Sequence, residues 1–189
     1  MKDHLFFKNY IYEISKNINF SNDDLLIINK IYKKFIKINK KNKIIFLGNG
    51  GSAAIASHVS VDLTKNAKIR STNFNESDLL TCLSNDYGYK NWMSKALEFY
   101  SITGDLIVII SSSGESKNVI SAANWCKKNK FELITLTGNK KNNSFKKINR
   151  DNLNLWIDSN SYNIIELSHL FSLLMIIDRI IGKSEYQNL

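Results

Sequence analysis

The sequence predicts an α/β fold in which helices cover both faces of a doubly wound, parallel β-sheet. The main observation is a strand–turn–helix pattern that occurs twice, over residues 44–64 and again over residues 105–129. In both places the strand is a run of apolar residues without alternation, which is typical of strands buried on both faces. Strands of this kind, separated by helices, are joined by right-handed crossovers into one parallel sheet.

A single domain accounts for the whole chain. Its 189 residues are 43% hydrophobic and 23% charged, a composition that argues against the disordered and fibrous classes. No proline and no linker-like segment divides it. We therefore expect one domain over residues 1–189, with N-terminal helices at 1–42 that serve packing or oligomerisation and an α/β core at 43–189.

Two helices are predicted before the first strand. Apolar residues recur at three- and four-residue spacing over residues 5–18, which is the period of an amphipathic helix. Residues 21–24 (Ser-Asn-Asp-Asp) offer a capping oxygen and first-turn acids for a second helix, whose apolar positions continue to Ile38. A lysine-rich segment at residues 40–43 then leads into the first strand.

The first strand–turn–helix unit contains the strongest local signal. Its strand, Ile44–Leu47, is stopped by a glycine-rich turn at residues 48–51 and followed by a helix of small residues at 52–64. Glycines allow the backbone to approach a ligand closely, and the N-terminus of the helix behind them favours an anion. The pattern is neither Gly-x-Gly-x-x-Gly nor a lysine-bearing P-loop, so we expect no nucleotide cofactor. The alternative is a tight turn without a ligand.

The second unit repeats this arrangement with hydroxyl groups. A strand at residues 105–110 leads into the serine-rich turn 111–116 (Ser-Ser-Ser-Gly-Glu-Ser) and a helix at about 118–129. Ligands of open α/β sheets bind beyond the carboxyl ends of the strands, where this turn would lie. A nest of hydroxyls and backbone amides suits a phosphoryl group, although a serine run can also be only a polar loop.

The remaining elements complete the sheet. Predicted strands and helices alternate to the end of the chain, and the segment between the two units holds a short strand and a helix. In chain order these are a strand at 79–83, a helix at 89–100, a strand at 131–138, a loop at 139–150, a strand at 153–157 and a helix at 162–181.

The net charge of +9 raises the question of a nucleic-acid partner. Of the 26 basic residues only Arg70, Arg150 and Arg179 are arginine, whereas proteins that read phosphates and bases rely on arginine forks. We interpret the surplus lysines as a solvated surface that also reflects an AT-rich genome, and expect no nucleic-acid partner.

The sequence also argues against membrane insertion and secretion. Residues 1–9 contain no apolar core of a signal peptide, and the apolar runs at 106–110 and 173–177 are too short to span a bilayer. Cys82 and Cys126 are far apart and have no metal-type spacing, as expected for reduced thiols. We therefore expect a soluble, cytoplasmic protein.

Three segments together resemble a known family. They are residues 48–52 (Gly-Asn-Gly-Gly-Ser), 83–89 (Leu-Ser-Asn-Asp-Tyr-Gly-Tyr) and the serine-rich turn 111–116. Their order and spacing resemble the sugar-isomerase (SIS) domain family, and within it the phosphoheptose isomerase branch. The resemblance covers nearly the whole chain. It implies a three-layer, flavodoxin-like fold with a five-stranded parallel sheet, a homotetramer with active sites between subunits, and a phosphosugar as ligand.

The resemblance also implies the residues of a binding site. Phosphate contacts would come from the hydroxyls of Ser52, Ser111, Ser112, Ser113 and Ser116. Sugar contacts would come from Asn49, Gly50, Gly51, Asn85 and Asp86.

Catalytic and zinc-binding roles are implied for His58, Asp62 and Glu166. His58 and Asp62 are four residues apart and therefore share one face of a helix. The chain departs from the family pattern at two positions. Asp62 stands where the family has glutamate, and Leu174 stands where it has a histidine that completes the site. For His169 we expect a buried, hydrogen-bonded histidine rather than a site residue.

These observations support two functions of different classes. The first is an aldose–ketose isomerase that interconverts sedoheptulose 7-phosphate and D-glycero-D-manno-heptose 7-phosphate, or a close phosphosugar, for heptose and surface polysaccharide synthesis. Asp62 and Glu166 would be its bases, with His58, Asp86 or zinc on the electrophilic side. The alternative is a non-catalytic phosphosugar-binding protein, such as a regulator that binds the replication initiator, which the departures at 62 and 174 favour.

Overall fold

A computed structural model describes residues 2–148 and 153–184 of the chain. It contains a five-stranded sheet in which every pair of neighbouring strands is parallel, in the order β2-β1-β3-β4-β5. This is the strand order of flavodoxin-like folds, so the expected doubly wound α/β fold is confirmed. The strands are β1 (Ile44–Leu47), β2 (Ser71–Asn73), β3 (Leu106–Ser111), β4 (Glu132–Thr137) and β5 (Asn154–Trp156).

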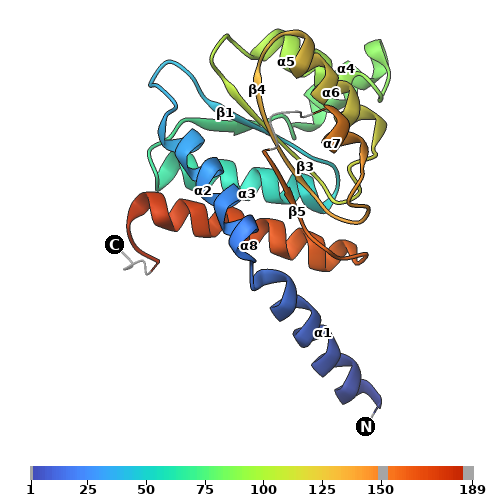
Figure 1. The fold of residues 1–189 in the computed structure, drawn as a ribbon. Helices are drawn as coiled ribbons and strands as arrows, with labels where there is room; N and C mark the ends of the chain where they lie inside the picture. Colours follow the sequence, from blue (N-terminus) through green and yellow to red (C-terminus); the bar gives the residue numbers. More distant parts are fainter. Residues whose placement is uncertain (1, 149–152, 185–189) are drawn as a thin grey trace.

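Helices form a layer on each face of the sheet (Figure 1). α2, α3 and α8 cover one face, and α4 to α7 cover the other. The helices are α1 (Lys2–Ile18), α2 (Asn22–Ile36), α3 (Gly51–Lys65), α4 (Ser77–Tyr87), α5 (Trp92–Tyr100), α6 (Lys117–Lys128), α7 (Ser144–Ile148) and α8 (Tyr162–Ile181).

The apolar side chains of the central strands pack against the helices on both faces of the sheet. In β1, Ile44 and Phe46 belong to the core beneath α2, α3 and α8, whereas Ile45 and Leu47 belong to the core beneath α4 to α7. All four side chains are at most 2% exposed. This division explains why the strand sequence does not alternate, because a polar residue on either face would be buried without water.

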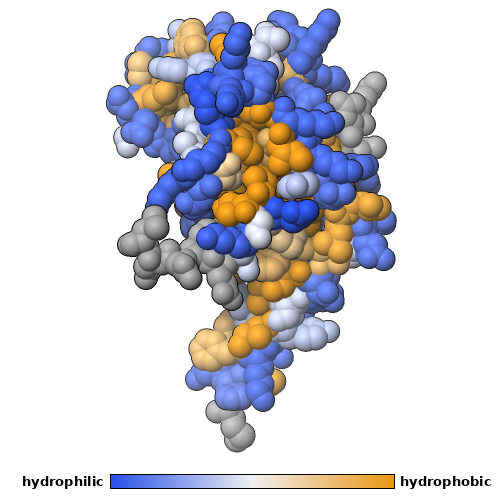
Figure 2. Space-filling view, turned by 90° about the vertical axis from the view of Figure 1, so that its left-hand side faces the viewer, coloured by the Kyte–Doolittle hydropathy of each residue, from blue (hydrophilic) through white to orange (hydrophobic). Residues whose placement is uncertain are grey.

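Helix α1 extends away from the body and packs against α8 (Figure 1). Several of its large apolar side chains are at least 60% exposed, namely Leu5, Phe6, Phe7, Ile11 and Tyr12. Figure 2 shows apolar side chains gathered on one side of the body and continuing onto the projecting helix. Large exposed apolar surfaces of this kind mark sites of interaction.

The prediction of a strand at 79–83 is wrong, because these residues lie within α4. Leu79, Leu80 and Leu83 recur at helical spacing and pack on the core beneath α4 to α7. The edge strand is instead β2, whose three residues, Ser71–Asn73, are polar and only partly buried and carry no apolar signal.

Other predicted elements agree with the structure. Ser21 caps α2 through a reciprocal pair of bonds with Asp24, and α8 spans the expected residues 162–181. The expected loop at 139–150 contains the short helix α7, and its residues 149 and 150 lie outside the described part of the chain.

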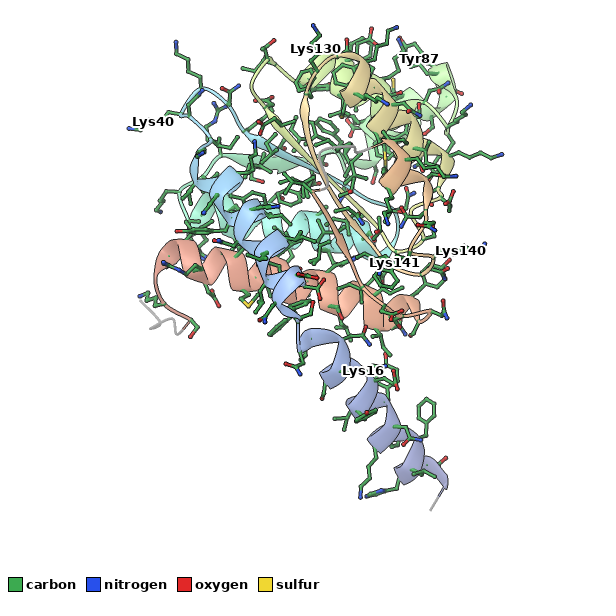
Figure 3. The ribbon with its side chains drawn as sticks, viewed as in Figure 1. Lys16, Lys40, Tyr87, Lys130, Lys140 and Lys141 are labelled. Atoms are coloured by element: carbon green, nitrogen blue, oxygen red, sulfur yellow. The ribbon has the colours of Figure 1, made fainter. Side chains whose placement is uncertain are left out.

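The surplus lysines lie on the surface. Lys40, Lys130 and Lys140 point outward from the rim of the molecule (Figure 3). Within the described residues, no helix combines the length and apolar character needed to cross a bilayer.

Candidate functional site

The two predicted turns meet where the connections of the sheet diverge. β1 and β3 are neighbours, but the helix that follows β1 (α3) covers one face and the helix that follows β3 (α6) covers the other. Such a divergence leaves a crevice beyond the carboxyl ends of the two strands, which is where open α/β sheets bind ligands. The glycine-rich turn at 48–51 and the serine-rich turn at 111–116 follow these two strands directly.

The glycine-rich turn brings the chain tightly into α3. A Cβ atom at Gly48 would lie 2.7 Å from the backbone carbonyl carbon and oxygen of Ser52, so no larger residue fits there. Gly50 precedes the helix with a φ of 54°, in the left-handed region that favours glycine. The turn therefore places the first amides of α3, and the buried Ser52, directly behind β1.

Glu166 reaches this turn from α8. Its carboxyl group lies against Gly51, where a Cβ atom would come within 2.6 Å of Glu166 Cδ and 2.8 Å of Oε1. Burial raises the pKa of Glu166, and the nearby Ser112 hydroxyl opposes that rise. Ser112 Oγ is itself buried and makes no hydrogen bond of ordinary geometry to the described residues. A carboxylate and an unpartnered hydroxyl thus lie together beside the start of α3.

Hydrogen bonds from backbone amides to serine hydroxyls within the serine-rich turn stabilise its conformation. Ser111 Oγ accepts a hydrogen bond of 3.2 Å from the Gly114 amide, and Ser113 Oγ accepts one of 3.2 Å from the Glu115 amide. Gly114 has a φ of 66°. Ser116 is the N-cap of α6, but its side chain makes no capping bond within the described residues.

Asn49 is held from two sides. Its side-chain amide exchanges two hydrogen bonds, of 2.9 and 2.8 Å, with that of Asn118, which is 2% exposed at the start of α6. Its Oδ1 also accepts a bond of 3.3 Å from the Tyr89 hydroxyl. These contacts connect the glycine-rich turn to α6 and to the segment between α4 and α5.

The sequence prediction missed Asn118 as a site residue. The available signal was a polar side chain within the first turn of a helix whose neighbouring residue, Val119, is buried.

Asn85 and Asp86 lie exposed near the end of α4, where the Asn85 amide donates a 3.0 Å hydrogen bond to Asp86 Oδ1. Among the described residues, neither side chain forms a hydrogen bond with the serine-rich turn. Tyr89, three residues beyond Asp86 in the chain, does contact Asn49 of the glycine-rich turn.

His58 and Asp62 form a pair on α3, with Nε2 and Oδ2 3.1 Å apart. Asp62 Oδ1 also accepts a bond from the Asn66 amide. Within the described ranges, no three His, Cys, Asp or Glu side chains lie close enough to hold a metal ion. The structure therefore brings His58 and Asp62 together and places Glu166 at Gly51, nearer the N-terminus of the same helix.

A hollow of about 370 Å³ opens beside Glu166. It is lined by Gly51 and Glu166 together with Tyr10 of α1, Asn163, and the apolar residues Ile55, Leu167 and Leu170. A larger hollow of about 480 Å³ lies between the α1–α2 junction and β5 and contains none of the predicted site residues.

A family model described as "SIS domain" matches residues 18–138, well over half of the chain. The chain belongs to the SIS domain family. Both turns and the segment between α4 and α5 lie within the matched residues.

Curated relatives in this family include proteins named phosphoheptose isomerase. The one from Campylobacter concisus is 36% identical over 135 residues, covering 68% of this chain and 70% of that protein. Those from Akkermansia muciniphila and Aneurinibacillus thermoaerophilus are 37% and 33% identical, over 51% and 60% of this chain. The chain spans 54% and 61% of the length of these two relatives.

Solved structures show the same fold. A phosphoheptose isomerase from Neisseria gonorrhoeae superposes with a TM-score of 0.83 at 24% identity, covering 95% of this chain and 97% of that one. A phosphoheptose isomerase from Francisella tularensis gives a TM-score of 0.83 at 22% identity, covering 96% and 97%.

Proposed function

We propose that this SIS-domain protein is an aldose–ketose isomerase that interconverts sedoheptulose 7-phosphate and D-glycero-D-manno-heptose 7-phosphate in the cytoplasm. The observation that carries the proposal is the partly buried carboxyl group of Glu166, which lies beside the start of α3 and the unpartnered hydroxyl of Ser112. The relatives named phosphoheptose isomerase support this choice of substrate.

The phosphate would bind between the two turns. The N-terminus of α3 supplies amide groups and a positive dipole, and Ser111, Ser112, Ser113 and Ser116 supply hydroxyls. Ser112 supports this assignment, because a buried hydroxyl without a protein partner gains a hydrogen bond when a ligand arrives. The Asn49 amide, fixed by Asn118 and Tyr89, would contact the sugar.

Glu166 is the base that this geometry favours. Isomerisation removes a proton from the carbon next to the carbonyl and returns it to the neighbouring carbon through an enediolate. Burial raises the pKa of Glu166, which brings its basicity closer to that needed for proton transfer near neutral pH. Asp62 and His58 would act from the adjacent turns of α3.

Zinc at His58, Asp62 and Glu166 stays a prediction. Imidazole and carboxylate groups are ligands that zinc accepts, and His58 and Asp62 already lie together. Glu166 does not join them within the described part of one chain, so the three residues do not form a complete site there. Elemental analysis of the purified protein measures its zinc content directly.

A homotetramer likewise stays a prediction. The exposed apolar face of α1 supports association with further copies of the chain, because exposure of a large apolar surface to water is unfavourable. Light scattering of the purified protein measures its mass, and a monomer at micromolar concentration would contradict the prediction.

A second candidate function is a phosphosugar-binding regulator without catalysis, which Asp62 and Leu174 favour. The deciding experiment follows sedoheptulose 7-phosphate by NMR with the wild type and Glu166→Gln, each with and without added zinc. Conversion by the wild type that is lost in the variant supports the isomerase. Binding of the sugar phosphate without conversion under all conditions would refute it and favour the regulator.

A further inference from the structure

His169 lies on α8 one turn beyond Glu166 and is completely buried. Its Nε2 atom is 3.1 Å from the backbone carbonyl oxygen of Thr137, at the end of β4. Because a carbonyl oxygen can only accept, Nε2 carries the proton and donates this bond. Burial lowers the pKa of His169 to about 4, so the ring is neutral near pH 7. The Nδ1 atom is then a bare acceptor, with no partner among the described residues.

The acceptor of this hydrogen bond, Thr137, lies next to a residue that is hydrogen-bonded to the serine-rich turn. The amide of Gly138, next to Thr137, donates a 2.9 Å bond to the carbonyl oxygen of Ser112. Gly138 also receives Ile165 of α8 so closely that a Cβ atom would lie 2.6 Å from Ile165 Cδ1. Residues 165 and 169 thus attach α8 to the end of β4 on either side of Glu166.

The hydrogen bond from His169 fixes the orientation of α8 relative to β4, which the apolar contacts of the helix do not. The rest of the buried face of α8 is mainly apolar, and apolar burial favours contact without fixing a direction. Two other buried polar side chains, Ser168 and Ser172, donate their hydrogen bonds within the helix, to the carbonyls of Ile164 and His169. They do not tie α8 to the sheet. Because Nδ1 has no partner among the described residues, the bond from Nε2 to Thr137 is the hydrogen bond that orients the ring.

We propose that His169 is a positioning residue that fixes the Glu166 carboxyl group over Gly51 and beside Ser112. The proposal rests on the proposed isomerase function, in which Glu166 acts on the substrate. His169 itself touches no substrate, because it is fully buried behind the turn.

Two amide substitutions separate position from mere packing. In His169→Gln the side-chain nitrogen can reach the place of Nε2, whereas in His169→Asn it is one methylene too short for Thr137. We expect His169→Asn to lower kcat by about 10- to 100-fold, since an ångström of misplacement has effects of that order. KM and the affinity for inorganic phosphate should change by less than about threefold, because the amides and hydroxyls that bind the phosphate remain in place. His169→Gln should restore most of kcat.

Ser168→Ala and Ser172→Ala are the matched controls, because both remove buried hydrogen bonds of α8 that do not reach the sheet. They should lower the melting temperature without a matching loss of kcat. Equal kcat in wild type and folded His169→Asn would overturn the proposal. So would a loss of kcat that follows melting temperature across all four variants.

Crystal structures of wild type and His169→Asn give a result that needs no activity. We expect the Glu166 carboxyl group to leave Gly51 in the variant, and an unchanged position would overturn the proposal. If the wild type converts no phosphosugar, the isomerase function fails, and the displacement of Glu166 still decides whether His169 positions it.

Discussion

Gly51→Ala tests whether catalysis depends on the close approach of Glu166 to α3. An ideal Cβ atom at residue 51 would lie 2.6 Å from Glu166 Cδ, whereas ordinary contacts begin at 3.4 Å. The carboxyl carbon must therefore retreat by at least about 0.8 Å, because the second carboxyl oxygen, Oε2, lies nearer still. A displacement of nearly an ångström at a reacting group costs on the order of 100-fold in rate, or about 2.7 kcal/mol of transition-state stabilisation.

The same substitution should leave the fold nearly unchanged. The atoms that must move are the end of a flexible side chain, and alanine is favoured over glycine in a helix by up to about 1 kcal/mol. We expect the free energy of unfolding, measured with urea, to change by less than about 1 kcal/mol. Gly48→Ala is the contrasting variant, because its Cβ atom would meet the backbone of Ser52 and should destabilise the protein.

A double-mutant cycle isolates the contact. Steady-state kinetics of Gly51→Ala, Glu166→Ala and the double variant should show that the alanine at 51 has no further effect once Glu166 is absent. A folded Gly51→Ala protein with kcat within threefold of wild type would refute the argument. The argument would also be refuted if the effects of Gly51→Ala and Glu166→Ala on kcat were additive in the double variant.

Three further predictions concern Ser112, Glu166 and Asp105. Ser112→Ala should leave stability almost unchanged, because the hydroxyl has no partner among the described residues, and should weaken phosphate binding by about tenfold in calorimetry. Because burial raises the pKa of Glu166, the acid limb of kcat/KM should lie above the usual glutamate range, and activity should fall as pH drops through it. A limb that persists in Glu166→Gln would contradict the assignment. Burial alone would raise the pKa of Asp105, but hydrogen bonds from the Ile102 amide and from Lys43 outweigh it and lower the pKa. The stability from Asp105 is therefore present above its unfolded pKa and is lost as pH falls through the lower folded value. Asp105→Asn should cost about 3 kcal/mol in urea unfolding at pH 7, and a change below about 1 kcal/mol would contradict this.

The glycine-rich and serine-rich turns could be predicted from the sequence because the patterns that indicate them are local. A buried strand, a glycine-rich or serine-rich turn and a helix follow one another within one short segment, at 44–64 and at 105–129, and Ser21 caps α2 through a residue three positions away. The strand β2 could not be found in this way. It is a short, polar edge strand, and only its pairing with β1 defines it.

The arrangement inside the site depends on contacts between distant parts of the chain. The resemblance names Gly51 and Glu166, but only the fold places one against the other. The sequence predicts a buried, hydrogen-bonded His169, which the structure confirms, yet its partner is a backbone carbonyl that no sequence pattern records. The convergence of His58, Asp62 and Glu166 remains a prediction for the same reason.

The packing of α1 and α2 on α8 has a consequence for folding during synthesis. Helices α1 and α2 are synthesised before α8, and both pack on it. Contacts between such distant segments form late in folding, since the intervening chain must first be ordered. On the ribosome, the apolar residues of α1 and α2 that pack on α8 therefore stay uncovered until residues 162–181 have emerged. Chaperones that shield apolar segments would find a binding region in α1 and α2 during this interval.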